Sequence, residues 1–325
     1  MGSTRMMKRI FLPEGTLIHT RENREATATP AALEAAMVRG AVLEGTVTLC
    51  DSSLCLHVEL GCAHGIIRPE EAVLCRPGER RKDIAVISRV GKPVAVLVTG
   101  LRMQDGELIA VLSRAEAQRR ALEALLTSTR PGDLLPARVT HLEPFGAFLD
   151  VGCGVASLLS VDCISISRIA HPRDRLTPGM ELTVAVKSIE RDTGRIYVTL
   201  RELLGTWEEN AAAFEAGQTV RGIVRSVEDY GIFVELAPNL AGLAELRPAD
   251  ADAIRRSIGH TAAVYIKSIV PERMKIKLVL IDVAAENAPV QPLRYFLSAQ
   301  STPHLSHWVY SPPASRRVVE TLFDA

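Results

Sequence analysis

The sequence predicts a mainly β protein built from tandem five-stranded barrels that are joined by short helices. An aromatic–glycine segment occurs twice, as EPFGAFLD at 143–150 and as EDYGIFVE at 228–235. A Lys-Ser-Ile segment follows each copy about forty residues later, at 187–189 and at 267–269. A fixed period of about eighty residues indicates a duplicated module.

The bulk composition is typical of a globular protein, because 47% of the 325 residues are hydrophobic and 23% are charged. The 38 basic residues equal the 38 acidic ones. This balance counts mildly against a nucleic-acid binder, although a local basic stripe can exist on a neutral chain. The sequence contains neither a long apolar run nor a signal-peptide pattern, so we expect a cytoplasmic protein without a membrane partner.

No pattern in the sequence indicates catalysis or a metal. The six cysteines form no Cys-x-x-Cys pair and have no metal-like spacing with histidine, so we expect reduced thiols. His304 and His307 are weak candidates for a metal or catalytic site, because no acidic or cysteine ligand stands at matching spacing. Phosphate-binding loops and nucleophile elbows are absent from the sequence. We therefore expect no catalytic residues, no metal and no cofactor.

The second module has the outline of an OB barrel. Its expected strands are 138–141, 145–151, 155–161, 182–189 and 195–200, with the longest connection between the third and the fourth. The first module is expected to have strands at 43–49, 54–60, 84–88, 94–98 and 108–112. Residues 1–28 look irregular, and helices are expected to begin after Thr29, Ser113 and Thr206, each of which can act as an N-cap.

Basic residues recur at outward positions of the two copies. In the fifth strand of the second module, Ile196 and Val198 face the core, so Arg195 and Tyr197 face out. Lys275 and Lys277 have the matching outward positions in the third module. By the same alternation, Lys187 and Lys267 point outward from the fourth strands.

The paired aromatics predict a surface for single-stranded nucleic acid. Phe145 and Phe148 are three residues apart, so a regular strand would place them on opposite faces, and the glycine between them suggests a β-bulge that returns both to one face. Aromatic rings among cations form a stacking platform. The competing interpretation is that one ring of each pair belongs to the core, but the recurrence favours the platform. The predicted RNA-binding residues are Phe145, Phe148, Lys187, Arg195, Tyr197, Tyr230, Phe233, Lys267, Lys275 and Lys277.

These features resemble the RNA-binding motif of ribosomal protein S1, which is an OB-fold repeat. The resemblance lies in Gly132, Gly179, the aromatic–glycine core and the strand at 195–200, and it recurs around Gly217 and Gly259. The whole chain is also similar to short three-repeat proteins of this family from Clostridia-like bacteria. The resemblance implies RNA contacts by the two aromatics and one late basic residue of each module: Phe145, Phe148 and Arg195, and Tyr230, Phe233 and Lys275.

The copies depart from the family pattern to different degrees. The family often has a histidine on the third strand, where this chain has Ser160 and Glu245, and Glu245 would repel phosphate. In the first module Leu54 and His57 replace the aromatics. Thr99 and Glu107 stand there in place of the two cations. We expect that the first module docks to a protein partner and does not bind RNA.

Two other segments have open interpretations. The loop at 171–175 holds three residues that can be basic, so it is either a phosphate contact or a solvated loop tip. The segment 284–325 holds five of the fourteen aromatic residues, which predicts that it packs back onto a module. The predicted organisation is an N-terminal segment with a short helix (1–37), a degenerate OB-like repeat (38–112), a linker helix (113–130), an OB-fold RNA-binding repeat (131–204), a linker helix (205–216), a second such repeat (217–283) and an aromatic-rich extension (284–325).

The sequence favours a non-catalytic protein that binds single-stranded RNA, in particular mRNA in translation, with the small ribosomal subunit as a further candidate partner. The alternative is a protein-interaction scaffold on the ribosome or on another RNA–protein machine. Net neutrality, Glu245 and the first module favour this alternative. The oligomeric state is left open.

Overall fold

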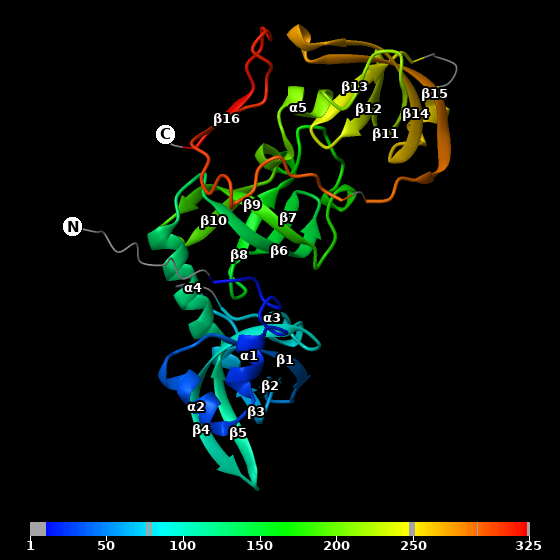
Figure 1. Ribbon diagram of the computed structural model, residues 1–325. Helices are drawn as coiled ribbons and strands as arrows, with labels where there is room; N and C mark the ends of the chain where they lie inside the picture. Colours follow the sequence, from blue (N-terminus) through cyan, green and yellow to red (C-terminus); the bar gives the residue numbers. More distant parts are fainter. Residues whose placement is uncertain (1–10, 76–77, 79, 247–250, 291, 324–325) are drawn as a thin grey trace, which may run out of the picture.

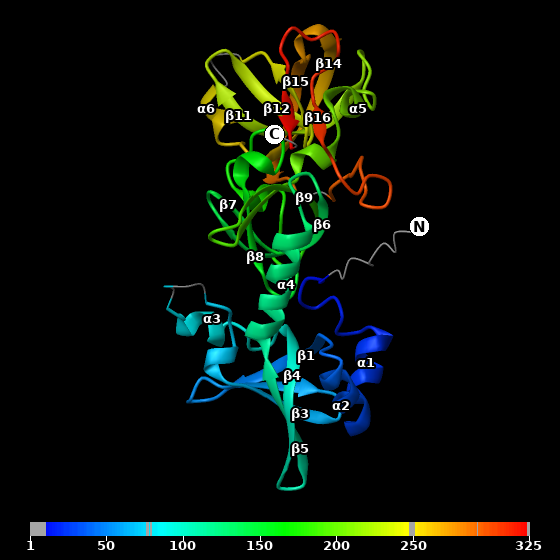
Figure 2. The ribbon, with the colours of Figure 1, turned by 90° about the vertical axis from the view of Figure 1, so that its left-hand side faces the viewer.

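The computed structural model describes residues 11–75, 78, 80–246, 251–290 and 292–323. Within them, three closed five-stranded barrels follow one another along the chain. Figures 1 and 2 show the barrels in one elongated row, with helix α4 between the first and the second. The mainly β class and the tandem OB-like barrels expected from the sequence are therefore confirmed.

The first barrel is covered by two helices at its N-terminal side. Thr20 caps α1 (Arg21–Thr27), and Thr29 caps α2 (Pro30–Val38) by accepting a hydrogen bond from the Ala32 N–H. The strands are β1 (Leu43–Cys50), β2 (Leu56–Leu60), β3 (Ala63–Ile67), β4 (Pro93–Gln104) and β5 (Glu107–Ser113), with η1 (Pro69–Glu71) and α3 (Asp83–Ile87) between β3 and β4.

Three sequence predictions for this barrel are wrong. The segment 84–88 forms helix α3 and not a strand, with Val86 buried and Ile84 exposed, so packing overrides the β-branched composition. Strand β3 was missed because it contains Gly65, which weakens a strand pattern; a Cβ there would lie 2.4 Å from Leu112 Cδ1. Helix α1 lies in the segment that looked irregular.

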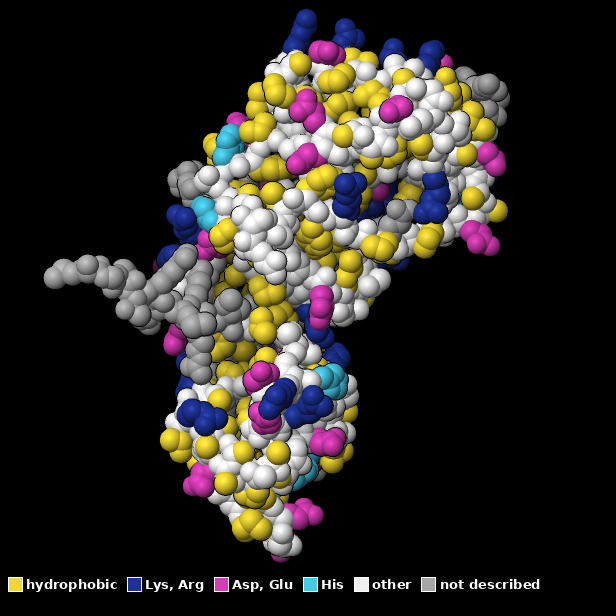
Figure 3. All heavy atoms as spheres, in the orientation of Figure 1, with side chains coloured by type: hydrophobic (Ala, Val, Ile, Leu, Met, Phe, Trp, Pro, Cys, Tyr) yellow, Lys and Arg dark blue, Asp and Glu magenta, His cyan; other side chains and the backbone are white. Residues whose placement is uncertain are grey.

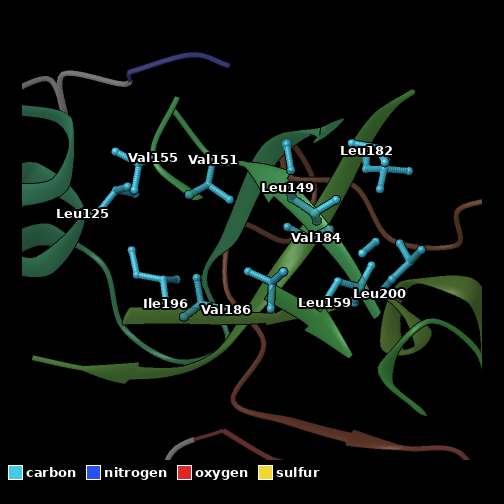
Figure 4. Close-up of a cluster of buried hydrophobic side chains, with 14 of the residues drawn as sticks. Leu125, Leu149, Val151, Val155, Leu159, Leu182, Val184, Val186, Ile196 and Leu200 are labelled. Atoms are coloured by element: carbon cyan, nitrogen blue, oxygen red, sulfur yellow. The ribbon is translucent and has the colours of Figure 1, made fainter. Parts of the chain in front are cut away.

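The second barrel follows α4 (Arg114–Ser128). Its strands are β6 (Leu134–Glu143), β7 (Gly146–Asp150), β8 (Ala156–Ser160), β9 (Glu181–Glu190) and β10 (Arg195–Thr199), with the short helices η2 (Val161–Cys163), η3 (Pro172–Asp174) and η4 (Arg201–Leu204). The β8–β10 pair is parallel and the other pairs are antiparallel. Figure 4 shows the core, where Leu149, Leu159 and Val184 point toward one another from different strands.

The third barrel repeats this topology after α5 (Trp207–Ala211), which has the capping box expected at Thr206. Its elements are β11 (Thr219–Glu228), β12 (Gly231–Ala237), β13 (Leu240–Ala244), α6 (Ala251–Arg255), β14 (His260–Val270), η6 (Pro271–Arg273) and β15 (Lys275–Asn287). The β13–β15 pair is parallel, as β8–β10 is in the second barrel.

The C-terminal extension packs against two barrels, as its aromatic content predicted. Its short hairpin consists of β16 (His307–Val309) and β17 (Glu320–Leu322). Trp308 and Tyr310 are buried in the core of the third barrel, while Leu305 and Phe323 pack with residues of the second barrel. The extension therefore spans the junction between them.

Glu14 joins the first barrel, α4 and the second barrel through its buried carboxylate and its backbone N–H. Glu14 forms two contacts with the Arg114 guanidinium, at 2.6 and 2.9 Å, and accepts a hydrogen bond from the Ala95 N–H of β4. Its own N–H donates to Asp150 of β7 at 2.7 Å. Below this junction, Ala117, Ala121 and Leu125 of α4 are buried in the same hydrophobic cluster as both barrels. These contacts fix the first barrel relative to the second.

A second buried polar cluster joins the second and third barrels. Glu235 of β12 pairs with Arg225 of β11 at 2.7 Å and with Arg175, which follows η3 of the second barrel. Next to it, the fully buried Asn239 accepts from the Ile166 N–H and donates to two carbonyl groups near η4. Like the first junction, this one is held by polar side chains that are buried.

Among the described residues, no helix is long and apolar enough to cross a membrane. In the same part of the chain, no group of three His, Cys, Asp or Glu side chains is arranged to hold a metal ion.

We predict that Glu14→Gln lowers the free energy of unfolding by on the order of 3 kcal/mol, because it leaves the buried Arg114 charge without its carboxylate. The urea midpoint of the full chain measures this. Glu181→Gln is the matched control, since Glu181 pairs with Arg138 at the surface, where an ion pair contributes about 0–1 kcal/mol. Equal midpoints for the two variants would contradict the structural role of Glu14.

Candidate nucleic-acid interface

One row of side chains crosses the outer face of the second barrel. The β-sheet register aligns Phe148 of β7 with Leu158 of β8, and Leu158 with Tyr197 of β10. Tyr197 is in turn aligned with Ser188 of β9. Side chains of laterally paired residues point to the same face of a sheet, so these four form one continuous surface. We call this the outer row.

Three rings gather at one end of the outer row. Phe145 and Phe148 meet edge to face, with ring centroids 6.1 Å apart and planes at 86°. His141 of β6 stacks on Phe148 at 4.5 Å and 9°. Phe145 is 55% exposed, so its ring is not part of the core. The sequence analysis missed His141; its signal is the strand register, which aligns it with Phe148.

The two phenylalanines share a face for a reason other than the predicted bulge in their own strand. Phe145 precedes β7, which begins at Gly146, so strand alternation does not apply to it. The pairing of β7 with β8 is regular. The irregularity lies opposite, in β6 at Thr140, whose hydroxyl donates to the Phe148 carbonyl at 3.0 Å. The prediction of the shared face is correct, and its proposed cause is wrong.

The glycine after the first aromatic allows the neighbouring strand to approach closely. A Cβ on Gly146 would lie 2.5 Å from the Leu159 carbonyl oxygen of β8, and a Cβ on Gly231 would lie 2.7 Å from the Ala244 carbonyl oxygen of β13. Both distances are too short for any side chain. The glycine therefore brings β7 against β8 at the point where the two rings project.

Two cations stand on this face at separate positions. Lys187 is the extra residue in a β-bulge of β9, and its ammonium group lies 3.1 Å from the Cys163 sulfur. This hydrogen bond holds the pKa of Lys187 above its usual value, so the side chain is a stable cation. Arg195 is exposed two residues before Tyr197 on β10 and is on the same face. Phe145 and Arg195 lie toward opposite ends of the face, so the face runs along the strands.

The third barrel has the same arrangement. Tyr230 and Phe233 have centroids 6.1 Å apart and planes at 89°, and Tyr230 is 69% exposed. The register aligns Phe233 with Leu243, Lys277 and Ser268 across β12, β13, β15 and β14. Its outer row thus has a lysine where the second barrel has Tyr197. Lys267, like Lys187, is the extra residue of a β-bulge, and Lys275 is exposed at the position of Arg195.

The structure shows where the residues that depart from the family pattern lie in the barrels. Glu245 is exposed and follows β13, at the position that Ser160 has beside Gly146 in the second barrel. In the first barrel, His57 has the position of Phe148: the Thr48 hydroxyl donates to its carbonyl, as Thr140 does to Phe148. Thr99 is the extra residue of the β4 bulge, as predicted from its alignment with Lys187.

One alignment in the first barrel is wrong. Val111 has the position of Tyr197, because it pairs with Ile66 as Tyr197 pairs with Leu158. Ile109, two residues before Val111, therefore has the position of Arg195. The sequence alignment had assigned this position to Glu107. The β4–β5 hairpin is longer than its counterpart, which shifts the alignment by two residues. The first barrel still has no cation at either position, and the His57 ring lies between His64 and Asp51, at 2.8 and 3.2 Å.

Most of the remaining candidates have structural roles. In the loop considered for phosphate contact, Arg175 is buried against Glu235, whereas Arg173 is exposed. His304 lies 2.9 Å from an Asp133 carboxylate oxygen, and His307 lies 2.7 Å from Glu320. The contacts of Arg175 and His304 join parts of the chain that are distant in sequence, and the His307 contact lies within the β16–β17 hairpin.

Comparison with known proteins defines the class of the second barrel: residues 128–201 match the S1 RNA binding domain. The chain is 32% identical over 161 residues to small ribosomal subunit protein bS1 of Staphylococcus aureus (strain COL), covering 48% of this chain and 40% of that protein. It is 31% identical over 161 residues to the bS1 homolog of Bacillus subtilis (strain 168), covering 48% and 41%. The chain therefore contains an S1 RNA-binding domain and is homologous to bS1 over about half of its length.

The chain spans about two fifths of the length of these relatives. Among solved structures it is similar to a multidomain protein with nucleic acid binding domains from Streptococcus pneumoniae TIGR4, at 15% identity and a TM-score of 0.24, covering 75% of this chain and 74% of that one. It is also similar to GSP13 from Bacillus subtilis, at 22% identity and a TM-score of 0.22, covering 23% and 57%.

We predict that Gly146→Ala lowers the free energy of unfolding by about 1–3 kcal/mol, because its methyl group overpacks the β7–β8 contact. The measurement is the urea midpoint of the full chain. The matched control is Gly100→Ala in β4, where the nearest atoms lie at 3.9 Å, and it should change stability by less than about 0.5 kcal/mol. A Gly146→Ala variant as stable as the control would argue against the close approach.

Proposed function

We propose that this chain is a non-catalytic protein of the cytoplasm that binds single-stranded RNA through the outer faces of its second and third barrels. The observation that carries the proposal is the repetition of one geometry. In both barrels an exposed ring meets a second ring edge to face at 6.1 Å, and a lysine occupies the same β-bulge. Two barrels would not keep this arrangement of exposed rings for packing alone, because exposed rings contribute little to a core.

The chemistry of the face suits unpaired bases. Every base has an aromatic surface that can stack on Phe148 or Phe233, which gives affinity with little sequence preference. Lys187, Lys267, Arg195 and Lys275 supply positive charge for the phosphates. If each barrel neutralises about two phosphates, the logarithm of the binding constant falls with the logarithm of salt concentration with a slope near −3.

We further propose that the RNA is mRNA in translation and that the small ribosomal subunit is a partner. The support is the homology of about half of the chain to small ribosomal subunit protein bS1. Two weak RNA sites on one rigid chain gain affinity through effective concentration, because binding at one barrel holds the strand close to the other.

The residues on the face of the first barrel indicate a different function for this barrel. It has Leu54, His57, Ile66 and Val111 where the second barrel has two phenylalanines, Leu158 and Tyr197. A less aromatic face without matching cations suits a protein ligand, so this barrel is the candidate for a scaffold function on an RNA–protein machine. Binding of the full chain to ribosomes that is insensitive to salt, without affinity for free oligonucleotides, would favour the scaffold over RNA binding.

We predict that Phe148→Ala and Phe233→Ala each weaken binding to a labelled oligouridine about 5- to 150-fold, because stacking of one base contributes about 1–3 kcal/mol. Fluorescence anisotropy at fixed salt measures this. Phe→Tyr substitutions at the same positions retain the ring and should keep most of the affinity. Phe→Leu substitutions retain apolar volume without a ring and should lose affinity. Unchanged affinity of the double alanine variant would refute the stacking face.

A further inference from the structure

A groove of about 710 Å³ lies beside the rings of the third barrel. Tyr230, Phe233 and Lys275 line it on the barrel side. Arg316 and Arg317 of the C-terminal extension line it as well, together with Arg168 from the loop after η2 in the second barrel. The rings of the third barrel therefore face a concave site whose walls come from three separate parts of the chain.

The extension is anchored firmly enough to form such a wall. The Tyr310 hydroxyl donates to the Asn239 carbonyl at 2.5 Å, and the Tyr310 carbonyl accepts from the Trp207 N–H at 3.0 Å. The loop between β16 and β17 is closed at its base, where the Val319 N–H donates to the Ser311 hydroxyl. Arg316 and Arg317 stand in this loop, beyond the anchored base, and both are exposed.

The groove is strongly basic although the whole chain has no net charge. Six Lys and Arg residues line it against two acidic ones, Glu228 and Glu272. One of the six, Arg225, is already paired with Glu235 inside the barrel junction. Figure 3 shows basic side chains spaced along the upper edge of the molecule, with acidic ones close to them. The basic excess of the groove comes from the barrel, the extension and the loop after η2 together.

We propose that the C-terminal hairpin is part of the RNA site of the third barrel, with Arg316 and Arg317 binding the phosphates of a strand whose bases stack on Tyr230 and Phe233. This inference rests on the proposed function and adds to it a wall that lies outside the barrel. Guanidinium groups bind phosphate through paired N–H donors in a planar fork that matches two phosphate oxygens.

The wall explains how the third barrel can bind RNA despite Glu245. That carboxylate repels phosphate at one edge of the outer row, whereas the second barrel has the neutral Ser160 at the matching position. Arg316 and Arg317 line the groove, which Glu245 does not, and their two positive charges offset the charge of this carboxylate. Arg168 extends the basic lining of the groove onto the second barrel.

The test compares Arg316→Gln plus Arg317→Gln with a control of equal charge change, Arg24→Gln plus Arg39→Gln on the helices of the first barrel. Binding of the full chain to oligouridine is measured between 50 and 200 mM salt. Loss of two phosphate contacts makes the plot of the logarithm of affinity against the logarithm of salt concentration shallower by about 1.4. Between 50 and 200 mM salt, the factor by which the affinity of the variant falls should therefore be about seven times smaller than the factor for the control. The variant should also bind more weakly than the control at 50 mM salt.

The outcomes separate this inference from the proposed function. If the unmodified chain binds oligouridine and depends on Phe148 and Phe233, but the arginine variant behaves as the control does, only the role of the hairpin is overturned. If the unmodified chain does not bind oligouridine, the proposed function fails and the inference fails with it. If the arginine variant keeps its RNA affinity but loses affinity for poly-glutamate, the groove serves an acidic protein and the inference is wrong.

Discussion

The arrangement of the molecule depends on two buried glutamates, each of which links neighbouring barrels. Glu14 holds Arg114 and contacts both the first and the second barrel, and Glu235 holds Arg175 of the second barrel against the third. A buried charge without its partner costs several kcal/mol, so any rotation of one barrel against the next must break these contacts at that cost. The faces of the three barrels are therefore fixed in direction, which a flexible linker would not achieve.

The nucleic-acid face depends on a different constraint, the close approach of two strands beside a glycine. Gly146 and Gly231 bring the hairpin turn against the neighbouring strand, and the residue before each glycine is left outside the strand. That residue is free to project its ring at right angles to the next one. The same backbone conformation in the two barrels gives nearly the same distance and angle between the paired rings, although the first ring is Phe145 in one barrel and Tyr230 in the other.

The three barrels differ in chemistry far more than in backbone. The first barrel has the bulge at Thr48 but neither the phenylalanines nor the cations. The second barrel has Phe148 and Tyr197 in its outer row, with the rings of Phe145 and His141 beside Phe148. The third barrel has two rings, a lysine in the row and a carboxylate at its edge. In our proposal the C-terminal hairpin adds two arginines to this third site, which offset the carboxylate at its edge.

The sequence by itself determined the repeat and the barrels, because alternation and local turn residues act over a few positions. It also predicted the shared face of each aromatic pair, but for the wrong reason, since the irregularity lies in the opposite strand. It missed what depends on contacts between distant segments. His141 joins Phe148 only through the strand register, Ile109 takes the place of Arg195 only because a hairpin is longer, and Arg175 is drawn from a loop into a buried ion pair. The position of Arg316 beside the third barrel was likewise decided by tertiary structure, since the packing of the extension, and no local pattern, brings it there.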